Sequence, residues 1–170
     1  MVEVFSFLDD KRMELHLLGR FENPEYEEKI KKSIHVRYLG QVSSNQVFPY
    51  LLGANVGLVL LQPTPAYLNS AENTTKLFEY MLCGLPVIAS DFPHLRKIIQ
   101  ENKCGICVDP TDPEKIAEAI KYILQNPAQA KKMGENGREA VLKKYSWEAL
   151  EEKFLNIYAQ LNNGRKNGNK

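Results

Sequence analysis

Two threonines and a lysine stand at the expected start of a helix. Asn73 or Thr74 is a suitable N-cap, which leaves the backbone N–H groups of Thr75, Lys76 and Leu77 without partners inside the helix. Such donors, together with the helix dipole, favour a bound anion by about 0.3–1 kcal/mol at an exposed site. The threonines are also compatible with simple capping, and Lys76 with a solvated surface charge. The pattern predicts an anion site.

A carboxylate follows one turn later, at Glu79. Its neighbours Phe78, Tyr80 and Met81 are apolar or aromatic, and charged groups in such surroundings are normally paired or in use. A carboxylate can accept hydrogen bonds from two adjacent hydroxyls, each worth about 1.5–3 kcal/mol. Anion donors and a diol acceptor in one helix describe a nucleoside-diphosphate site, although a glutamate that only favours the helix is the alternative. We assign the diphosphate to Thr74, Thr75 and Lys76, and the ribose to Glu79.

Apolar runs alternate with helical patterns along the chain, which is typical of an α/β fold with a parallel sheet. The expected strands are 14–18, 34–39, 56–61, 86–90 and 105–108. The expected helices are 24–32, 43 or 44–52, one beginning near 74, 93–100, 113–124, 127–144 and 146–161. Residues 2–8 favour a helix, with a strand as the alternative, and residues 62–73 are expected to form a loop because of Pro63 and Pro65.

Composition narrows the class of protein. The 170 residues suit one domain, with 44% hydrophobic and 25% charged residues. A net charge of +1 gives no electrostatic case for nucleic-acid binding. No apolar run approaches the roughly 20 residues that span a bilayer. Three cysteines, an odd number, favour a reducing compartment, so we expect a cytoplasmic protein. Cys104 and Cys107 lack a second ligand pair, and we expect no metal site.

The segment KLFEYMLCGLPVIASD (76–91) resembles the donor-site signature of retaining glycosyltransferases of the group 1 type, which have the GT-B fold. Residues 105–113 resemble that family's G-x-x-V-D-P-x-D-P element, and 15–19 and 36–40 resemble its two glycine-terminated strands. The order and spacing of these motifs extend the resemblance over about residues 2–161.

The resemblance implies a Rossmann-like doubly wound parallel sheet with helices on both faces, the C-terminal half of a GT-B fold. Residues 1–161 are then a nucleotide-sugar-binding domain whose first strand is missing. Independently of the resemblance, the Asn- and Lys-rich composition of residues 162–170 predicts a disordered tail. An N-terminal acceptor domain would precede the binding domain, so this chain alone is expected to be inactive. The base is assigned to Gln41 and Val42. Ala71 stands where the family has a sugar-contacting glutamate, so Glu72 and Asn73 are assigned to the donor sugar.

The implied reaction transfers a hexose from a nucleoside diphosphate, expected to be UDP, to an acceptor hydroxyl with retention of configuration and without a metal or other cofactor. The implied acceptor is a glycan or a lipid-linked acceptor in polysaccharide or lipopolysaccharide biosynthesis. The resemblance also implies a peripheral position at the inner face of the cell membrane. The alternatives are a nucleotide-sugar epimerase or hydrolase of the same fold, and a non-catalytic nucleotide-binding module.

Overall fold

The computed structural model describes residues 2–8, 13–70 and 74–167. Its strands are β1 (Leu15–Leu18), β2 (Val36–Gly40), β3 (Gly57–Val59), β4 (Val87–Ser90) and β5 (Gly105–Val108). Its helices are the 3-10 helix η1 (Val2–Phe7), α1 (Pro24–Lys31), α2 (Ser44–Leu52), α3 (Pro65–Ser70), α4 (Thr75–Leu82), α5 (Pro93–Asn102), α6 (Pro113–Gln125), α7 (Pro127–Ala140), the π-helix η3 (Val141–Tyr145) and α8 (Trp147–Asn167).

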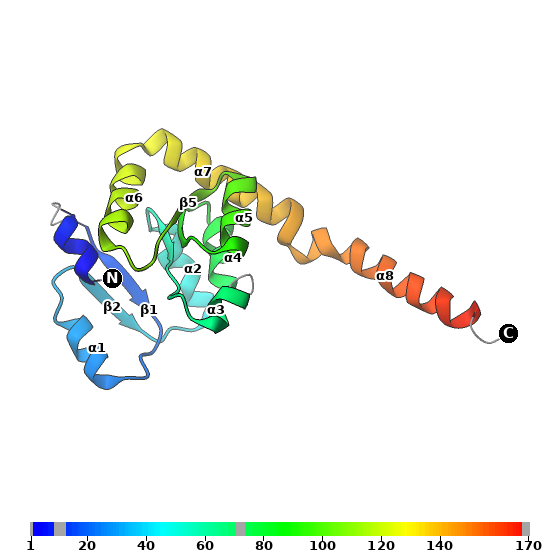
Figure 1. Ribbon diagram of the computed structural model, residues 1–170, viewed down its shortest axis with the longest axis horizontal. Coiled ribbons are helices and arrows are strands. Elements are labelled where there is room, and N and C mark those ends of the chain that lie inside the picture. The colour runs from blue at the N-terminus through cyan, green and yellow to red at the C-terminus, as the bar shows by residue number, and fades with distance from the viewer. Residues whose placement is uncertain (1, 9–12, 71–73, 168–170) are drawn as a thin grey trace.

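Every described strand pair is parallel, as the alternating pattern predicts. The described strands form two separate ladders, β1–β2 and β3–β4–β5, where one continuous sheet was expected. In Figure 1, β1 and β2 lie side by side beneath the part of the body that contains β5. The α/β, Rossmann-like fold class is confirmed, and the break between the ladders is a feature that the sequence pattern did not reveal.

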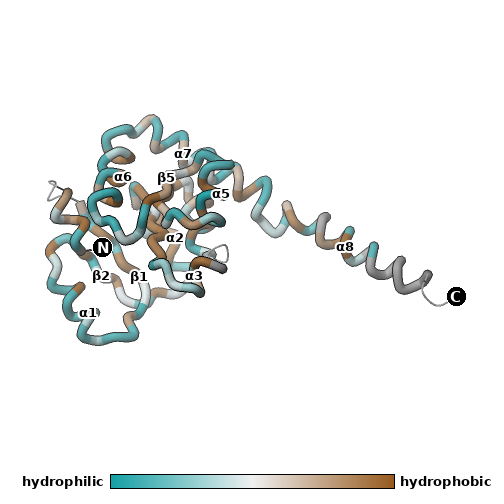
Figure 2. The backbone as a smooth tube through the Cα atoms, viewed as in Figure 1, coloured by the Kyte–Doolittle hydropathy of each residue, from teal (hydrophilic) through white to brown (hydrophobic). Residues whose placement is uncertain are grey.

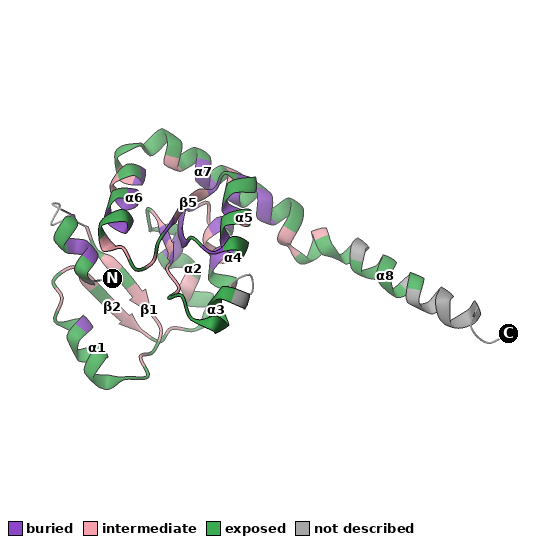
Figure 3. Ribbon diagram, in the orientation of Figure 1, coloured by how far each residue is buried: buried purple, intermediate pink, exposed green. Residues whose placement is uncertain are grey.

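Two apolar clusters cover the two faces of the three-stranded ladder. One contains buried residues of α4, α5 and the end of α7, among them Leu77, Met81 and Ile99. The other joins η1 and α6 to Ile88 and Val108 of the ladder. Figure 3 shows these buried residues within the body, and Figure 2 shows that the hydrophobic backbone segments follow the same distribution. Helices on both faces are therefore held by apolar burial.

The helix starts follow from local chemistry. The side chain of Asn23 caps α1 by accepting hydrogen bonds from the N–H groups of Glu25 and Tyr26. Asp112 caps α6 in the same way through the N–H of Lys115. Proline occupies the first position of α1, α5, α6 and α7, where no N–H is needed. These signals explain why the predicted helix starts agree closely with the structure.

Three elements differ from expectation. Residues 62–73 were expected to be a loop, but Pro65 starts the short helix α3, because a proline at the first position costs no hydrogen bond. β3 ends at Val59, two residues early, and Leu61 instead bonds to the side chain of Ser90. Residues 2–7 form a 3-10 helix, the tighter form common in short pieces.

The C-terminal helix also differs. α8 continues to Asn167, whereas residues from 162 onward were expected to be disordered. Each residue added to an existing helix gains one backbone hydrogen bond without a new nucleation cost. Residues that favour a helix only weakly can therefore continue it. Figure 1 shows α8 projecting away from the body. Its side chains include a ring series in which Trp147 contacts Phe154 and Phe154 contacts Tyr158, with centroids 5.8 and 4.9 Å apart.

Candidate functional site

α4 begins at the edge of the sheet where β3 ends. β3 and β4 are parallel neighbours, so the chain between them must return along α4, which places the N-terminus of α4 at the carboxyl ends of these strands. Ligands of open α/β sheets bind at this edge. Thr74, the N-cap, has extended backbone angles (φ −81°, ψ 92°) and makes no side-chain capping bond. The predicted diphosphate residues therefore stand at the expected edge.

The first turn of α4 offers fewer donors than the sequence suggests. The N–H of Leu77 donates to the carbonyl oxygen of Thr74 at 3.1 Å, so its assignment as a free donor is wrong. A tight i to i−3 bond is common at a helix start and satisfies this amide. Within the described ranges, the amides of Thr75 and Lys76 have no hydrogen-bond partner, and both residues are exposed. Two amides and one ammonium group thus remain at the helix start.

Glu79 lies one turn further along α4 and is half-buried. Across the described part of the chain, its carboxylate has neither a hydrogen bond nor an ion pair. Burial raises the pKa of Tyr80, and the nearby Glu79 charge raises that pKa further. Burial and then Glu79 likewise raise the pKa of Cys83, while Arg138 of α7 lowers it. The carboxylate is therefore available to accept hydrogen bonds from a ligand.

The helix that carries these groups is fixed on its inner side. Leu77 and Met81 are fully buried, and the ring of Phe78 packs on that of Tyr145 in η3, with centroids 5.0 Å apart. Tyr80 lies over Gly57 of β3, where a Cβ atom would stand 2.4 Å from its ring. The inner face of α4 is thus held by the apolar core, by η3 and by β3. The opposite face presents Thr75, Lys76 and Glu79.

The helix ends in a Schellman motif at the glycine of the signature. Gly84 adopts φ 73°, and its N–H donates to the carbonyl of Met81 at 3.0 Å. The N–H of Leu85 donates to the carbonyl of Tyr80, also at 3.0 Å. The left-handed conformation suits glycine, which explains the Cys83-Gly84-Leu85 sequence between α4 and β4. This turn sets where α4 stops and β4 starts.

The predicted base-contacting residues lie in the turn after β2. Gln41 is exposed and Val42 is half-buried. The N–H of Gly19, after β1, donates to the carbonyl of Gly40 at 2.8 Å, so the two glycine-terminated strands are joined where they end. Like the start of α4, this turn follows the carboxyl end of a parallel strand.

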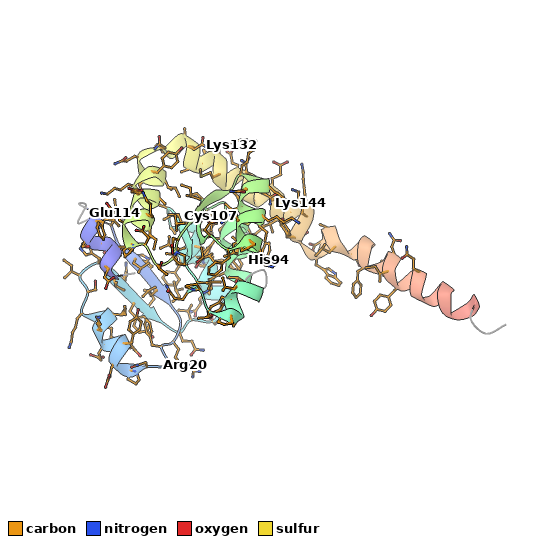
Figure 4. All side chains as sticks on the ribbon, viewed as in Figure 1. Arg20, His94, Cys107, Glu114, Lys132 and Lys144 are labelled. Atoms are coloured by element: carbon orange, nitrogen blue, oxygen red, sulfur yellow. The ribbon has the colours of Figure 1, made fainter. Side chains whose placement is uncertain are left out.

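A cavity of about 220 Å³ opens beside the ends of β1 and β2. Phe21 lines it together with Tyr26 and Tyr38, and the centroid of its ring lies 5.6 Å from that of Tyr26 and 5.3 Å from that of Tyr38. The hydroxyl of Tyr38 donates to the carbonyl of Gly19 at 2.9 Å. Arg20 also lines the cavity, and Figure 4 shows it at the periphery near α1. The sequence analysis did not predict this aromatic lining. The signal that could have indicated it is the presence of Phe21, Tyr26 and Tyr38 in or next to the two glycine-terminated strands.

The proposed sugar-contacting residues, Glu72 and Asn73, lie outside the described residues, as does Ala71. Their assignment stays a prediction.

The acidic and cysteine residues near β4 and β5 line a second cavity, of about 410 Å³, which includes Asp91, Cys107 and Asp109. Asp91 forms an ion pair with Arg96. Asp109 accepts hydrogen bonds from the N–H and hydroxyl of Thr111, which lower its pKa. Burial raises the pKa of Cys107 to about 12. Among the described residues, no three His, Cys, Asp or Glu side chains form a group suited to a metal ion. Asp109 thus stabilises a turn, and Asp91 takes part in an ion pair.

This chain is similar to several known proteins. The family model for group 1 glycosyl transferases matches residues 1–140. A GDP-mannose-dependent monoacylated alpha-(1-6)-phosphatidylinositol monomannoside mannosyltransferase of Corynebacterium glutamicum is 24% identical over 157 residues, covering 92% of this chain and 41% of that protein. Sucrose-phosphate synthase of Thermosynechococcus elongatus is 27% identical, with a TM-score of 0.74 over 96% of this chain and 42% of its own.

The fold is also shared with a more distant structure. Anabaena HepE in complex with UDP is 13% identical, with a TM-score of 0.72 over 94% of this chain and 44% of its own. This chain therefore spans about two-fifths of the length of each of these proteins. In the described residues, no helix combines the length and the apolar character needed to cross a membrane. The match over residues 1–140, together with the shared Rossmann-like fold, shows that this chain belongs to the group 1 glycosyltransferase family.

Proposed function

We propose that this chain is the donor-binding part of a glycosyltransferase, and that it holds a nucleoside-diphosphate sugar across the outer face of α4. The observation that supports this most strongly is the spacing on α4. Among the described residues, the amides of Thr75 and Lys76 have no hydrogen-bond partner, and the carboxylate of Glu79, one turn later, is unpaired. The amides and the Lys76 ammonium suit a diphosphate. The carboxylate suits the vicinal hydroxyls of a ribose.

The reaction that fits this arrangement is transfer of a hexose to an acceptor hydroxyl. As the glycosidic bond stretches, the departing diphosphate gains negative charge. Donors fixed at the helix start are already oriented toward that charge, so they stabilise the transition state more than the ground state. In this proposal the amides and Lys76 supply the stabilisation, without a metal, and the sugar is transferred with retention of configuration.

The base and the acceptor belong to the same proposal. Gln41 and Val42 would border the base, with Glu72 and Asn73 near the sugar. The Corynebacterium relative is named as GDP-mannose-dependent, and the Anabaena structure contains UDP, so guanine and uracil are both candidates. We infer a glycan or lipid-linked acceptor, because the Corynebacterium relative is named for a phosphatidylinositol monomannoside. A peripheral position at the inner face of the cell membrane is part of the same proposal. Contacts to the acceptor would come from the part of the relatives that this chain does not span.

Ligand-observed NMR with UDP, GDP and ADP, each with and without a sugar, tests the proposal. We expect saturation transfer to at least one nucleotide, with a dissociation constant between about 0.1 and 1 mM, or roughly −5.5 to −4 kcal/mol. Inorganic pyrophosphate should compete for the site, whereas a free monosaccharide should not. The absence of any signal at millimolar nucleotide would contradict nucleotide binding. Release of free sugar from the donor by this chain would favour a hydrolase instead.

A further inference from the structure

The aromatic cavity beside β1 and β2 lies at the edge of the sheet where ligands of open α/β folds bind. Arg20 and Phe21, which line it, belong to the turn that follows β1. The N–H of Gly19 in that turn donates to the carbonyl of Gly40, at the end of β2. The two strands are parallel, so both end at this edge. The cavity therefore adjoins the turn after Gly40, to which the proposed function assigns the base.

The rings of the cavity are held by contacts of their own. The Tyr38 ring is anchored through its hydroxyl, which donates to the carbonyl of Gly19 at 2.9 Å. The Phe21 ring packs against both tyrosines of the cavity, tilted by 50° to Tyr38 and by 73° to Tyr26. Tyr26 nevertheless keeps 48% of its surface exposed, so a flat ring is still open to a ligand. A preformed aromatic cavity with few polar groups is the usual form of a small-molecule site.

Two cations border these rings, and they differ in whether they are already paired. Lys31 lies over the ring of Tyr38, with Nζ 5.5 Å from the ring centroid, and it also forms an ion pair with Glu27 at 2.7 Å. Arg20 is exposed, and within the described ranges its guanidinium makes neither a hydrogen bond nor an ion pair. Arg20 is therefore the cation at this cavity whose donors are open to a ligand.

An arginine beside aromatic rings can distinguish one nucleobase from another. A guanidinium carries five N–H donors in a planar fork and has no acceptor. Guanine presents two neighbouring acceptors, O6 and N7, which match this fork, whereas adenine presents an acceptor next to an amino donor. Uracil presents the single acceptor O4 at the corresponding edge. Aromatic rings stack on the flat face of every base, so the rings supply affinity and the arginine supplies selection.

We propose that this cavity holds the base of the donor nucleotide, and that Arg20 selects guanine by donating two hydrogen bonds to its O6 and N7 while the base stacks on Phe21. The inference rests on the proposed function, because it takes a nucleotide as the ligand of this edge. It narrows the donor from any nucleoside-diphosphate sugar to a GDP sugar. Arg20 and Phe21 are then residues that determine specificity.

NMR titrations that compare GDP with UDP test this selection. Arg20→Lys keeps the positive charge but replaces the planar fork with one ammonium group. We expect the wild-type chain to bind GDP at least fivefold more tightly than UDP, and Arg20→Lys to bind the two equally. Arg37→Lys is the matched control and should keep the wild-type ratio. Arg37 is also exposed, but it precedes Tyr38 in β2, so its side chain points to the other face of the strand.

The aromatic signals of the protein locate the base. We expect guanosine to shift the ring resonances of Phe21, Tyr26 and Tyr38, and guanine H8 to give cross-peaks to the Phe21 ring, whereas pyrophosphate should leave these signals unchanged. Phe21→Leu keeps an apolar side chain without the ring, so GDP affinity should fall at least fivefold. Phe154→Leu, at an exposed ring of α8, should bind GDP like wild type. Amide spectra that match the wild type verify that each variant is folded.

The outcomes distinguish this inference from the proposed function. If GDP and pyrophosphate bind but Arg20→Lys leaves the ratio of GDP to UDP affinity unchanged, the inference is overturned and the diphosphate site stands. Ring signals that do not respond to guanosine, or tighter binding of UDP than of GDP by the wild-type chain, lead to the same conclusion. If GDP, UDP and pyrophosphate all fail to bind, the proposed function fails, and the assignment of the base fails with it.

Discussion

The carbonyl oxygen of Gly84 lies 1.9 Å from the position that a Cβ atom on Gly134 would occupy. The backbone of α7 thus rests directly on the turn that ends α4 and starts β4. Gly137, one turn further along α7, faces Met81 and Cys104. The position of the candidate site on α4 therefore depends on α7, and both glycines allow the close approach.

Replacing Gly134 with alanine should destabilise the protein. Alanine favours a helix by about 1 kcal/mol over glycine, but here its methyl group would overlap a backbone oxygen that cannot turn aside. We expect the free energy of unfolding to fall by about 1–3 kcal/mol, measured by urea denaturation. Gly137→Ala is the matched comparison, because the nearest atoms to its new methyl group lie at 3.2 Å or more, against 1.9 Å at Gly134, so its loss of stability should be smaller. Equal stability of the two variants would argue against the backbone contact.

The hydrogen bonds of the Ser90 hydroxyl should also stabilise the folded protein. Its buried hydroxyl accepts a hydrogen bond from the N–H of Leu61 at 2.7 Å and donates to the Leu61 carbonyl at 2.8 Å. Ser90→Ala leaves both backbone groups without this partner, so we expect a loss of about 1–3 kcal/mol in thermal or urea unfolding. The exposed residue Ser44 supplies the control, and Ser44→Ala should change stability by less than about 0.5 kcal/mol. A neutral Ser90→Ala variant would contradict this role.

Stability should fall at alkaline pH because of two thiols, Cys104, which is buried, and Cys107, which is half-buried. Burial raises the pKa of Cys104 to about 11 and that of Cys107 to about 12, from an ordinary value near 9. The folded state therefore holds these protons more tightly than the unfolded chain does. Their contribution is complete below pH 9 and is lost as the pH rises from 9 toward 12.

Urea unfolding at pH 8, 9 and 10 measures this loss. The slope of stability against pH should be shallower in a variant with Cys104→Ala and Cys107→Ala. Tyrosine titration is common to both proteins, so it cancels in the comparison. Identical slopes would contradict the raised thiol pKa values.

The sequence predicted those elements whose own residues determine them. α6 follows from an apolar stripe that includes Ile116, Ile120 and Ile123, all buried in the structure, and from the Asp112 cap. β5 follows from a short apolar run. The sequence analysis missed α3, because it took the proline pair as an indication of a loop. Pro65 instead occupies the first position of a helix.

Features that depend on strand pairing or on the exact geometry of a turn could not be predicted in this way. The break between the ladders depends on which strands pair, and the alternating pattern only says that they are parallel. The 3.1 Å bond from Leu77 to Thr74 depends on how tightly the first turn of α4 closes. The ring of Phe21 meets Tyr38 because β1 and β2 are neighbours, which local periodicity does not encode.

The central claim is that Glu79 holds ribose hydroxyls, and nucleotide titration of Glu79→Gln tests it most directly. UDP and GDP would each be compared with its 2′,3′-dideoxy counterpart, by NMR titration of the wild-type chain and the variant. For the ribonucleotide that binds, we predict at least a tenfold loss of affinity, in line with about 1.5–3 kcal/mol for hydrogen bonds to a charged group. The dideoxy nucleotide should bind both proteins equally, and Glu135→Gln, at an exposed site on α7, should bind like wild type. Unchanged ribonucleotide affinity in Glu79→Gln, or an equal loss for the dideoxy form, would contradict the account.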